Sequence, residues 1–283
     1  MSSTGLVMEG GAMRGMFTNG VIDVFMENDI TFDGAIGVSA GAVFGCNIQS
    51  KQIGRPIRYN KRFCKDWRYV SIRSWLLTGN LYGVDLCYNR IPYELDPFDI
   101  KAFQENPMKF YLVVTDVESG EPVYHLCTTG GEEDMDWFRA SASMPIASKP
   151  VEIGGRKYLD GGISDSIPLV YFQSLGYNRN VLILTQPADY VKPPQKHPVL
   201  MNLMLRRYPQ VARALADRHE TYNRTTAMIR EMEKTGQVFV IRPPEALNIG
   251  AVCKDENELQ RVYDIGRRTA EERLEAMKEF LAR

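Results

Sequence analysis

The stretch Phe32–Gly45, which reads FDGAIGVSAGAVFG, places Ser39 where an apolar, strand-like run changes to a helical pattern. Gly37 and Gly41 flank the serine at the spacing G-x-S-x-G. In a strand-to-helix elbow of this kind the hydroxyl is exposed, the backbone is strained, and side chains two positions away would clash. A helix that Ser39 merely caps, with glycines for close packing, explains the same five residues. The motif alone leaves Ser39 open between a nucleophile and a cap.

The residues before this stretch alternate between strand and helix. Residues 5–8 (GLVM) are apolar, residues 13–26 carry apolar side chains at helical spacing, and residues 34–38 are apolar again. Parallel strands joined by a crossover helix end at the same edge of a sheet. The loop after residues 5–8 is therefore expected beside Ser39.

The later sequence continues the same alternation without an internal repeat or a low-complexity linker. We predict an α/β fold: a three-layer sandwich with a mostly parallel central sheet and a C-terminal helical extension. The predicted parts are residues 5–190, a catalytic domain, and residues 191–283, a helical part with one further strand that packs on the same domain. The later predicted elements are hairpins (109–117 with 122–128, and 150–153 with 157–162), strands (181–186 and 238–244) and helices (167–176 and 254–283).

The composition restricts the partners and the compartment. The chain has 283 residues, and its net charge of -1 gives no general attraction to nucleic acid, which we do not expect as a partner. Five widely spaced cysteines without a C-x-x-C pair argue against a disulfide framework and against a metal site of the zinc type. No secretory leader, membrane-spanning run or lipidation motif is recognisable, so we expect a cytoplasmic protein. Nothing in the sequence specifies an oligomeric state.

A glycine-rich loop, Glu9–Gly15, lies between the first predicted strand and the first predicted helix. Its glycines let backbone N–H groups point outward at a helix start, where a phosphate or the oxyanion of an ester intermediate could bind. Gly10, Ala12 and Gly15 also have the spacing of a degraded dinucleotide motif. That alternative needs an acidic residue at the end of the second strand, which here ends in Val38 and Ser39. We therefore expect no organic cofactor.

A third element, Asp160-Gly161-Gly162, is by itself an ordinary turn signal. Together and in this order, the three elements resemble the patatin-like family of lipid acyl hydrolases, of the bacterial type with a Ser-Asp dyad. That family has a glycine-rich oxyanion loop followed by arginine, a G-x-S-x-G elbow and a later D-G-[AG]. The resemblance covers roughly residues 5–190 and includes the run RASASMPIASKPVEIGGRKYLDGGISDSIPL.

The resemblance implies a role for each matched residue and a lipid ester as substrate, with neither metal nor cofactor. Ser39 would be the nucleophile and Asp160 its base. Glu9 and Ala12 depart from the family pattern, which commonly has aspartate and a third glycine there. The methyl of Ala12 would shift the donor geometry or narrow the site, without removing the backbone donor. The implied oxyanion hole comprises Gly10, Gly11 and Ala12, with Arg14 fixing the loop, and the elbow and turn glycines are Gly15, Gly37, Gly41, Gly161 and Gly162.

Two other functions remain open. An α/β-hydrolase triad would use His197 or His219, which follow Asp160 in the order Ser, Asp, His, but that fold places several strands before its nucleophile, and only two precede Ser39. We interpret His125 as a structural histidine. A lipid-binding or scaffold protein could keep the fold without turnover.

Two segments suggest contact with lipid. Met201–Tyr208, rich in methionine and leucine, could line an acyl channel, contact a membrane, or form a helix packed on the sheet. Residues 51–75 follow the helix of Ser39, interleave aromatic and basic side chains, and contain one acid, Asp66; they would form a cap that binds anionic membranes, or a solvated helix face with its aromatics in the core. The eight basic residues are Lys51, Arg55, Arg58, Lys61, Arg62, Lys65, Arg68 and Arg73.

Overall fold

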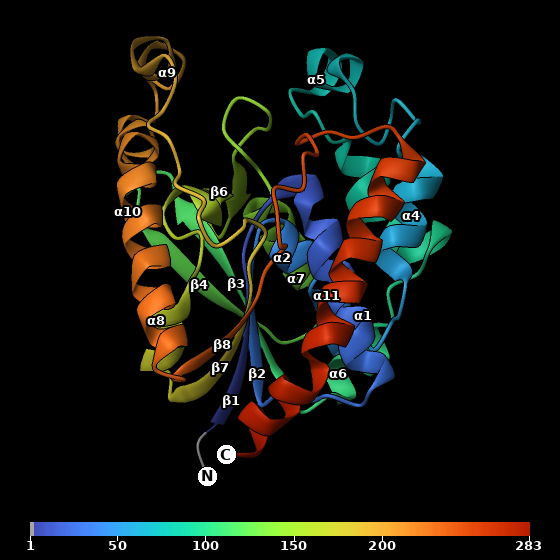
Figure 1. The fold of residues 1–283 in the computed structure, drawn as a ribbon. Coiled ribbons are helices and arrows are strands. Elements are labelled where there is room, and N and C mark those ends of the chain that lie inside the picture. Colours follow the sequence, from blue (N-terminus) through green and yellow to red (C-terminus); the bar gives the residue numbers. More distant parts are fainter. Residues whose placement is uncertain (1–2) are drawn as a thin grey trace.

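Eight strands form one sheet in the order β5-β6-β3-β2-β1-β7-β8, with β4 paired to β3. The computed structural model describes residues 3–283 (Figure 1). The pairs β1–β2, β1–β7, β2–β3 and β7–β8 are parallel, and the pairs that involve β4, β5 or β6 are antiparallel. The predicted α/β fold with a mostly parallel sheet is confirmed. The strands are β1 (Ser3–Met8), β2 (Gly34–Val38), β3 (Lys109–Asp116), β4 (Pro122–Cys127), β5 (Val151–Ile153), β6 (Arg156–Asp160), β7 (Tyr177–Ile183) and β8 (Val238–Ile241).

Helices cover both faces of this sheet (Figure 1). The central strand β2 (GAIGV) is apolar and every residue of it is buried, so both faces of the sheet need a helical layer. On one face pack α1 (Gly15–Glu27), α4 (Arg55–Phe63) and α11 (Glu256–Ala282); on the other pack α8 (Leu169–Ser174) and α10 (Pro209–Lys234). The predicted three layers are therefore present. The remaining helices are α2 (Ala40–Val43), α3 (Cys46–Gln49), α5 (Ile72–Thr78), α6 (Ile100–Glu105), α7 (Glu132–Ser141), α9 (Pro198–Met204), two short turns, η1 (Ala12–Arg14) and η3 (Gly161–Ile163), and the π-helical η2 (Asp85–Leu95).

Helices α1 and α11 touch at their backbones. A Cβ atom on Gly20 would lie 2.2 Å from the carbonyl oxygen of Tyr263, and one on Gly266 would lie 2.1 Å from that of Phe17. The Tyr263 hydroxyl donates to the carboxylate of Asp23 at 2.7 Å. Burial raises the pKa of Asp23 to about 6, although this hydrogen bond opposes the shift. The charged pattern predicted as a helix over residues 254–283 is thus α11, a packed part of the fold.

The C-terminal part shares the sheet with the rest of the chain. Strand β8 pairs in parallel with β7, and α10 and α11 lie on opposite faces. The predicted boundary at residue 190 falls between β7 and α9, and the division itself stays a prediction. Within residues 3–283, no helix combines the length and the apolar composition needed to cross a membrane.

Candidate active site

Ser39 occupies a strained turn between β2 and α2. Its backbone has φ 54° and ψ -120°, a conformation that non-glycine residues rarely adopt and that costs about 1–3 kcal/mol. The Ser39 N–H donates to Ser141 Oγ at 3.0 Å, and that hydroxyl donates to the carbonyl of Val113 at 2.7 Å. A side chain from α7 and the backbone of β3 therefore hold the turn in place.

The two flanking glycines are explained by contact. A Cβ atom on Gly37 would lie 2.3 Å from the Gly41 carbonyl oxygen, and one on Gly41 would lie 2.4 Å from that of Met8. The Ser39 side chain makes no capping hydrogen bond to α2. The elbow geometry thus accounts for these residues better than the helix-cap alternative does.

Ser39 and Asp160 come together although 121 residues separate them. Ser39 Oγ donates to Asp160 Oδ2 at 2.7 Å, and the Gly162 N–H donates to Asp160 Oδ1 at 2.7 Å. Asp160, at the end of β6, is 1% exposed. Burial raises its pKa to about 6, against the lowering effects of these two hydrogen bonds and of the charge on Arg218. A carboxylate with this pKa is a better base for a hydroxyl than one at the usual value of about 3.9.

The glycine-rich loop lies against the elbow, as the parallel pairing of β1 and β2 predicts. A Cβ atom on Gly10 would lie 3.1 Å from Ser39 Cβ. The contacts of residues 3–283 include no acceptor for the N–H groups of Gly10, Gly11 and Ala12. Ala12 has φ 47°, in the left-handed region that favours glycine. This explains why the family pattern has glycine there, and it leaves the backbone donor of Ala12 in place.

The other predicted glycines and Arg14 also lie at this junction. A Cβ atom would meet the Ala40 side chain at Gly15, the Thr185 side chain at Gly11 and the Val113 carbonyl oxygen at Gly161. Arg14 Nε donates to Thr185 Oγ1 at 3.5 Å. Arg14 therefore contacts the residues after β7, in agreement with a role in holding the loop.

Glu9 connects the loop to the C-terminal part of the chain. Its side chain is 2% exposed, and its two carboxylate oxygens accept from the Thr185 N–H at 2.6 Å and from the Tyr222 hydroxyl at 2.7 Å. Tyr222 belongs to α10, 213 residues further along the chain. The longer side chain of glutamate thus serves a buried contact between β1, β7 and α10.

A largely apolar cavity of about 210 Å³ opens beside Ser39 on the α1 and α4 side of the sheet. It exceeds the cavities of about 150 Å³ that admit benzene in other proteins. Neither Asp160 nor the C-terminal helices α9, α10 and α11 contribute to its wall. Among its lining residues are Met13, Ser39, Val43, Phe44, Tyr59, Tyr69, Leu81, Tyr82, Ile91, Phe98 and Phe138.

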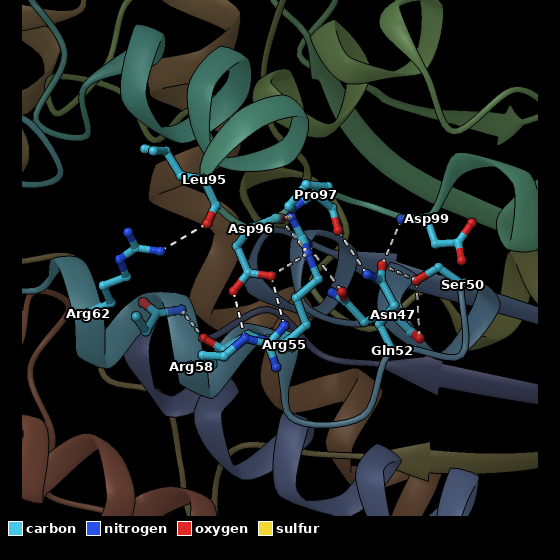
Figure 2. Close-up of polar contacts among 12 residues, drawn as sticks. Asn47, Ser50, Gln52, Arg55, Arg58, Arg62, Leu95, Asp96, Pro97 and Asp99 are labelled. Atoms are coloured by element: carbon cyan, nitrogen blue, oxygen red, sulfur yellow. Dashed lines mark hydrogen bonds and ion pairs between the residues drawn. The ribbon is translucent and has the colours of Figure 1, made fainter.

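One wall of the cavity is fixed by a buried ion network (Figure 2). The Arg55 guanidinium, 5% exposed, donates to the carbonyl of Asp96 at 2.7 and 3.0 Å and to Asn47 Oδ1 at 3.2 Å. Arg58 donates to both carboxylate oxygens of Asp96 at 2.8 Å. These contacts join α4 to the end of η2, so that two segments of the cavity wall behave as one unit.

The three histidines lie apart from the pair. His125 Nε2 lies 2.8 Å from Asp134 Oδ1, and the His125 ring stacks on Trp137. His125, Cys127 and Asp134 are close enough to hold a metal ion, but Asp134 also accepts from Thr129 and Gly130. Burial raises the pKa of Asp134, and these hydrogen bonds outweigh it and lower the value. Within residues 3–283, no hydrogen bond joins a histidine to Ser39 or Asp160, and this geometry disfavours the triad.

Comparison with known proteins places this geometry in a family. The profile of the patatin-like phospholipases matches residues 6–172, more than half of the chain. The chain belongs to the patatin-like phospholipase family. The resemblance read from the three motifs is thereby confirmed. A second profile, described as a domain of unknown function (DUF6363), matches residues 208–282.

Individual relatives are distant. The chain is 29% identical over 273 residues to the uncharacterized protein YjjU of Escherichia coli (strain K12), covering 93% of this chain and 74% of YjjU. It is 28% identical over 182 residues to lysophospholipase NTE1 of Debaryomyces hansenii, covering 62% of this chain and 11% of NTE1. The NTE1 of Lodderomyces elongisporus is 24% identical over 291 residues, and the chain spans 18% of its length. The crystal structure of VipD from Legionella pneumophila aligns with 98% of this chain and 67% of VipD, at a TM-score of 0.49 and 13% identity.

In this patatin-like chain, three side chains of residues 51–75 line the cavity, and four of the eight cations in this segment form ion pairs. Arg58 pairs with Asp96, Lys65 with Glu256 and Arg68 with Asp66. Tyr59, Phe63 and Tyr69 are buried. The interpretation with aromatic residues in the core is therefore closer to the structure than a lipid-binding face made of all eight cations.

The segment around Met201 does not line the cavity beside Ser39. In α9, Met201 packs against a small cluster that includes Leu159 of β6, whereas Val199, Leu200, Leu203 and Met204 are at least half exposed. The exposed apolar side chains favour contact with an apolar surface, one of the three interpretations of this segment.

Sequence reasoning missed several residues that position the patatin-like site. Ser141 supports the elbow, Thr115 Oγ1 donates to the Asp160 carbonyl at 2.8 Å, and Tyr222 binds Glu9. Ser141 lies within the run RASAS that already resembled the family. Thr115 and Tyr222 stand in no motif, and only the folded chain brings them to the site.

Proposed function

We propose that this protein is a serine lipid acyl hydrolase that cleaves carboxylic esters of phospholipids or related lipids. The observation that carries the proposal is the 2.7 Å hydrogen bond to the buried Asp160 from the Oγ of Ser39, a residue that lines an apolar cavity. A hydroxyl paired with a base can attack an ester, and an apolar cavity suits an acyl chain. The names of the yeast relatives, lysophospholipases, support the same class of substrate.

The proposed reaction needs only this pair and the loop. Ser39 Oγ attacks the ester carbonyl carbon while its proton passes to Asp160 Oδ2. The N–H groups of Gly10, Gly11 and Ala12 bind the resulting oxyanion, and one well-placed donor of this kind contributes about 2.7–4 kcal/mol. Asp160 returns the proton to the leaving alcohol. Water, activated by the same carboxylate, then releases the fatty acid from Ser39.

A covalent probe tests the proposal directly. We expect a fluorophosphonate to label Ser39 in the folded protein, and mass spectrometry of the digested chain identifies the labelled residue. The same preparation should hydrolyse at least one member of a panel of phospholipids, lysophospholipids, monoacylglycerols and short p-nitrophenyl esters. An unlabelled Ser39 and an inactive panel would support the alternative, a lipid-binding or scaffold protein.

We also propose peripheral contact with a membrane through α5 and α9. Both helices project at the end of the molecule where the parallel strands terminate, on either side of the site (Figure 1). Ile72, Leu76 and Leu77 of α5 are 68–72% exposed. Exposed cations adjoin these apolar tips: Arg73 lies in α5, and Arg206 and Arg207 follow α9. Apolar side chains beside cations suit an anionic lipid surface.

Replacing Leu76 and Leu77 together by serine should reduce hydrolysis of anionic vesicles about tenfold or more. Full burial of one leucine side chain stabilises by about 1.5–3 kcal/mol, so partial insertion of both leucines into the membrane is enough for a tenfold change in binding. Hydrolysis of a soluble short ester should remain unchanged. The matched control is Val170→Ser on α8, a side chain exposed to 61% and distant from α5 and α9. Equal losses on both substrates would show that α5 is structural and would contradict membrane contact.

A further inference from the structure

Two cations from the C-terminal part lie beside the candidate active site without an anionic partner. Within the described chain, neither Lys192 nor Arg218 has a carboxylate oxygen within 4.0 Å, and their side chains make no hydrogen bond. Arg218 Nε is buried and unsatisfied. A buried charged donor without an acceptor is costly, so its retention beside a reaction site calls for a ligand.

Both cations are attached to α10. Arg218 belongs to this helix, and its Nη2 and Asp160 Oδ1 lie 3.2 and 3.0 Å from the point where a Cβ atom of Gly162 would stand. The Lys192 Nζ atom lies 4.5 Å from the centre of the Tyr222 ring. The Lys192 backbone exchanges two hydrogen bonds with the Asn223 side chain on α10, at 2.8 and 3.0 Å. Helix α10 thus carries Arg218 next to Asp160 and anchors Lys192 beside Tyr222, which binds Glu9.

The side chains around Lys192 carry more positive than negative charge. The carboxylate of Glu9 acts on Lys192 electrostatically, but both of its oxygens already accept hydrogen bonds. Burial, together with the charges of Arg218 and Arg14 and against the opposing effect of Glu9, lowers the pKa of Lys192 to about 8. The cluster would therefore gain stability from a bound anion.

The cations and the cavity are on the two faces of the sheet. The cavity wall includes residues of α4, whereas Arg218 belongs to α10, which covers the other face (Figure 1), and Lys192 contacts α10. A lipid with its ester carbonyl at Ser39 and its acyl chain in the cavity would extend its polar end toward these cations. Phosphate is the anionic group that such a lipid carries at this end, and arginine and lysine are its usual ligands.

We propose that Lys192 and Arg218 form a subsite for the headgroup phosphate of the lipid substrate. This proposal rests on the proposed hydrolase function and adds the class of substrate, a phosphate-bearing lipid in preference to a neutral glyceride. Neither Lys192 nor Arg218 belongs to a family motif. The C-terminal part of the chain would thus determine the specificity for phosphate, while residues 9–162 supply the reacting groups.

The test compares two lipids that differ only in the phosphate, a lysophosphatidic acid and the monoacylglycerol with the same acyl chain, both below their aggregation concentrations. Assays near pH 7 keep Asp160 ionised and Lys192 protonated, since their pKa values are about 6 and about 8. We expect wild type to prefer the phosphate-bearing lipid. The variant Lys192→Gln with Arg218→Gln should lose about 10- to 100-fold of this preference through a higher KM for the phosphate-bearing lipid, whereas any change in kcat caused by the effect of Arg218 on Asp160 is the same for both lipids and leaves the preference unaltered.

Arg224→Gln is the matched control, because it removes a cation from an exposed position of the same helix, and it should leave the preference unchanged. An equal loss on both lipids in the double variant would overturn the subsite while leaving the hydrolase function intact. If inorganic phosphate bound wild type and not the double variant, while the lipid preference stayed the same, the cations would serve free phosphate and the headgroup assignment would fail. A wild type inactive on every lipid ester would overturn the proposed function, and this inference with it.

Discussion

Ser39→Ala and Asp160→Asn should each lower lipid ester hydrolysis by about 10⁴-fold or more. The first change removes the attacking atom, and the second removes the carboxylate that accepts its proton across 2.7 Å. Residues that act as one unit lose nearly all their effect when either is removed, so the double variant should be no slower than the single ones. Initial rates on the best substrate of the panel, with circular dichroism to verify folding, measure this.

The histidines provide the control for that result. His125→Gln, His197→Gln and His219→Gln should each keep activity within about threefold of wild type, because no imidazole bonds to the pair in residues 3–283. A folded histidine variant as inactive as Asp160→Asn would contradict the dyad and reinstate a triad.

The pH dependence should show one acidic limb. Asp160 must be ionised to act as a base, and burial raises its pKa to about 6. Below this value kcat/KM should fall about tenfold per pH unit, so activity at pH 4 should be about 100-fold lower than at pH 8. Because the charge of Arg218 lowers the pKa of Asp160, Arg218→Gln should move the limb to higher pH. Rate profiles on a neutral soluble ester measure both effects, and a pH-independent rate between pH 4 and 8 would contradict the role of Asp160.

Protonation of the two buried acids with raised pKa values does not destabilise the fold over this limb. Asp160 and Asp23 have pKa values raised in the folded state, so both contribute stability that is present at low pH and lost as pH rises through about 6. Their protonation therefore stabilises the fold over the range in which activity falls. Thermal unfolding followed at pH 5 and pH 7 separates the two effects.

Most of the fold followed from local patterns. Apolar runs and glycine turns located the two hairpins and the buried strands, because strand periodicity and turn chemistry are encoded within about ten residues. The family pattern and the parallel arrangement of β1 and β2 brought Ser39, Asp160 and the loop together before any coordinates. The irregular stretch between β2 and β3 was less predictable, since the π-helical η2 contains Pro92 and depends on the buried Arg55.

The contacts around the candidate site could not be predicted from the sequence, because they join residues that are far apart along the chain. The contact of Glu9 with Tyr222 joins residues 213 positions apart, and no local pattern marks it. The same holds for Arg218 beside Gly162. Counting charges over residues 51–75 predicted a more cationic surface than the structure has, because the count does not show that Arg58 and Arg68 already have acidic partners.

The backbone contact of α1 with α11 sets the order in which the nascent chain can mature. Tyr263 and Asp23 lie 240 residues apart, and at about 5–20 residues per second the ribosome needs roughly 12–50 s to supply the second after the first. During that interval the face of α1 that α11 will cover, including Gly20, stays open to chaperones and to other nascent chains. The Ser39 elbow is therefore synthesised early, whereas the neighbouring helix α1 is covered only when α11 follows.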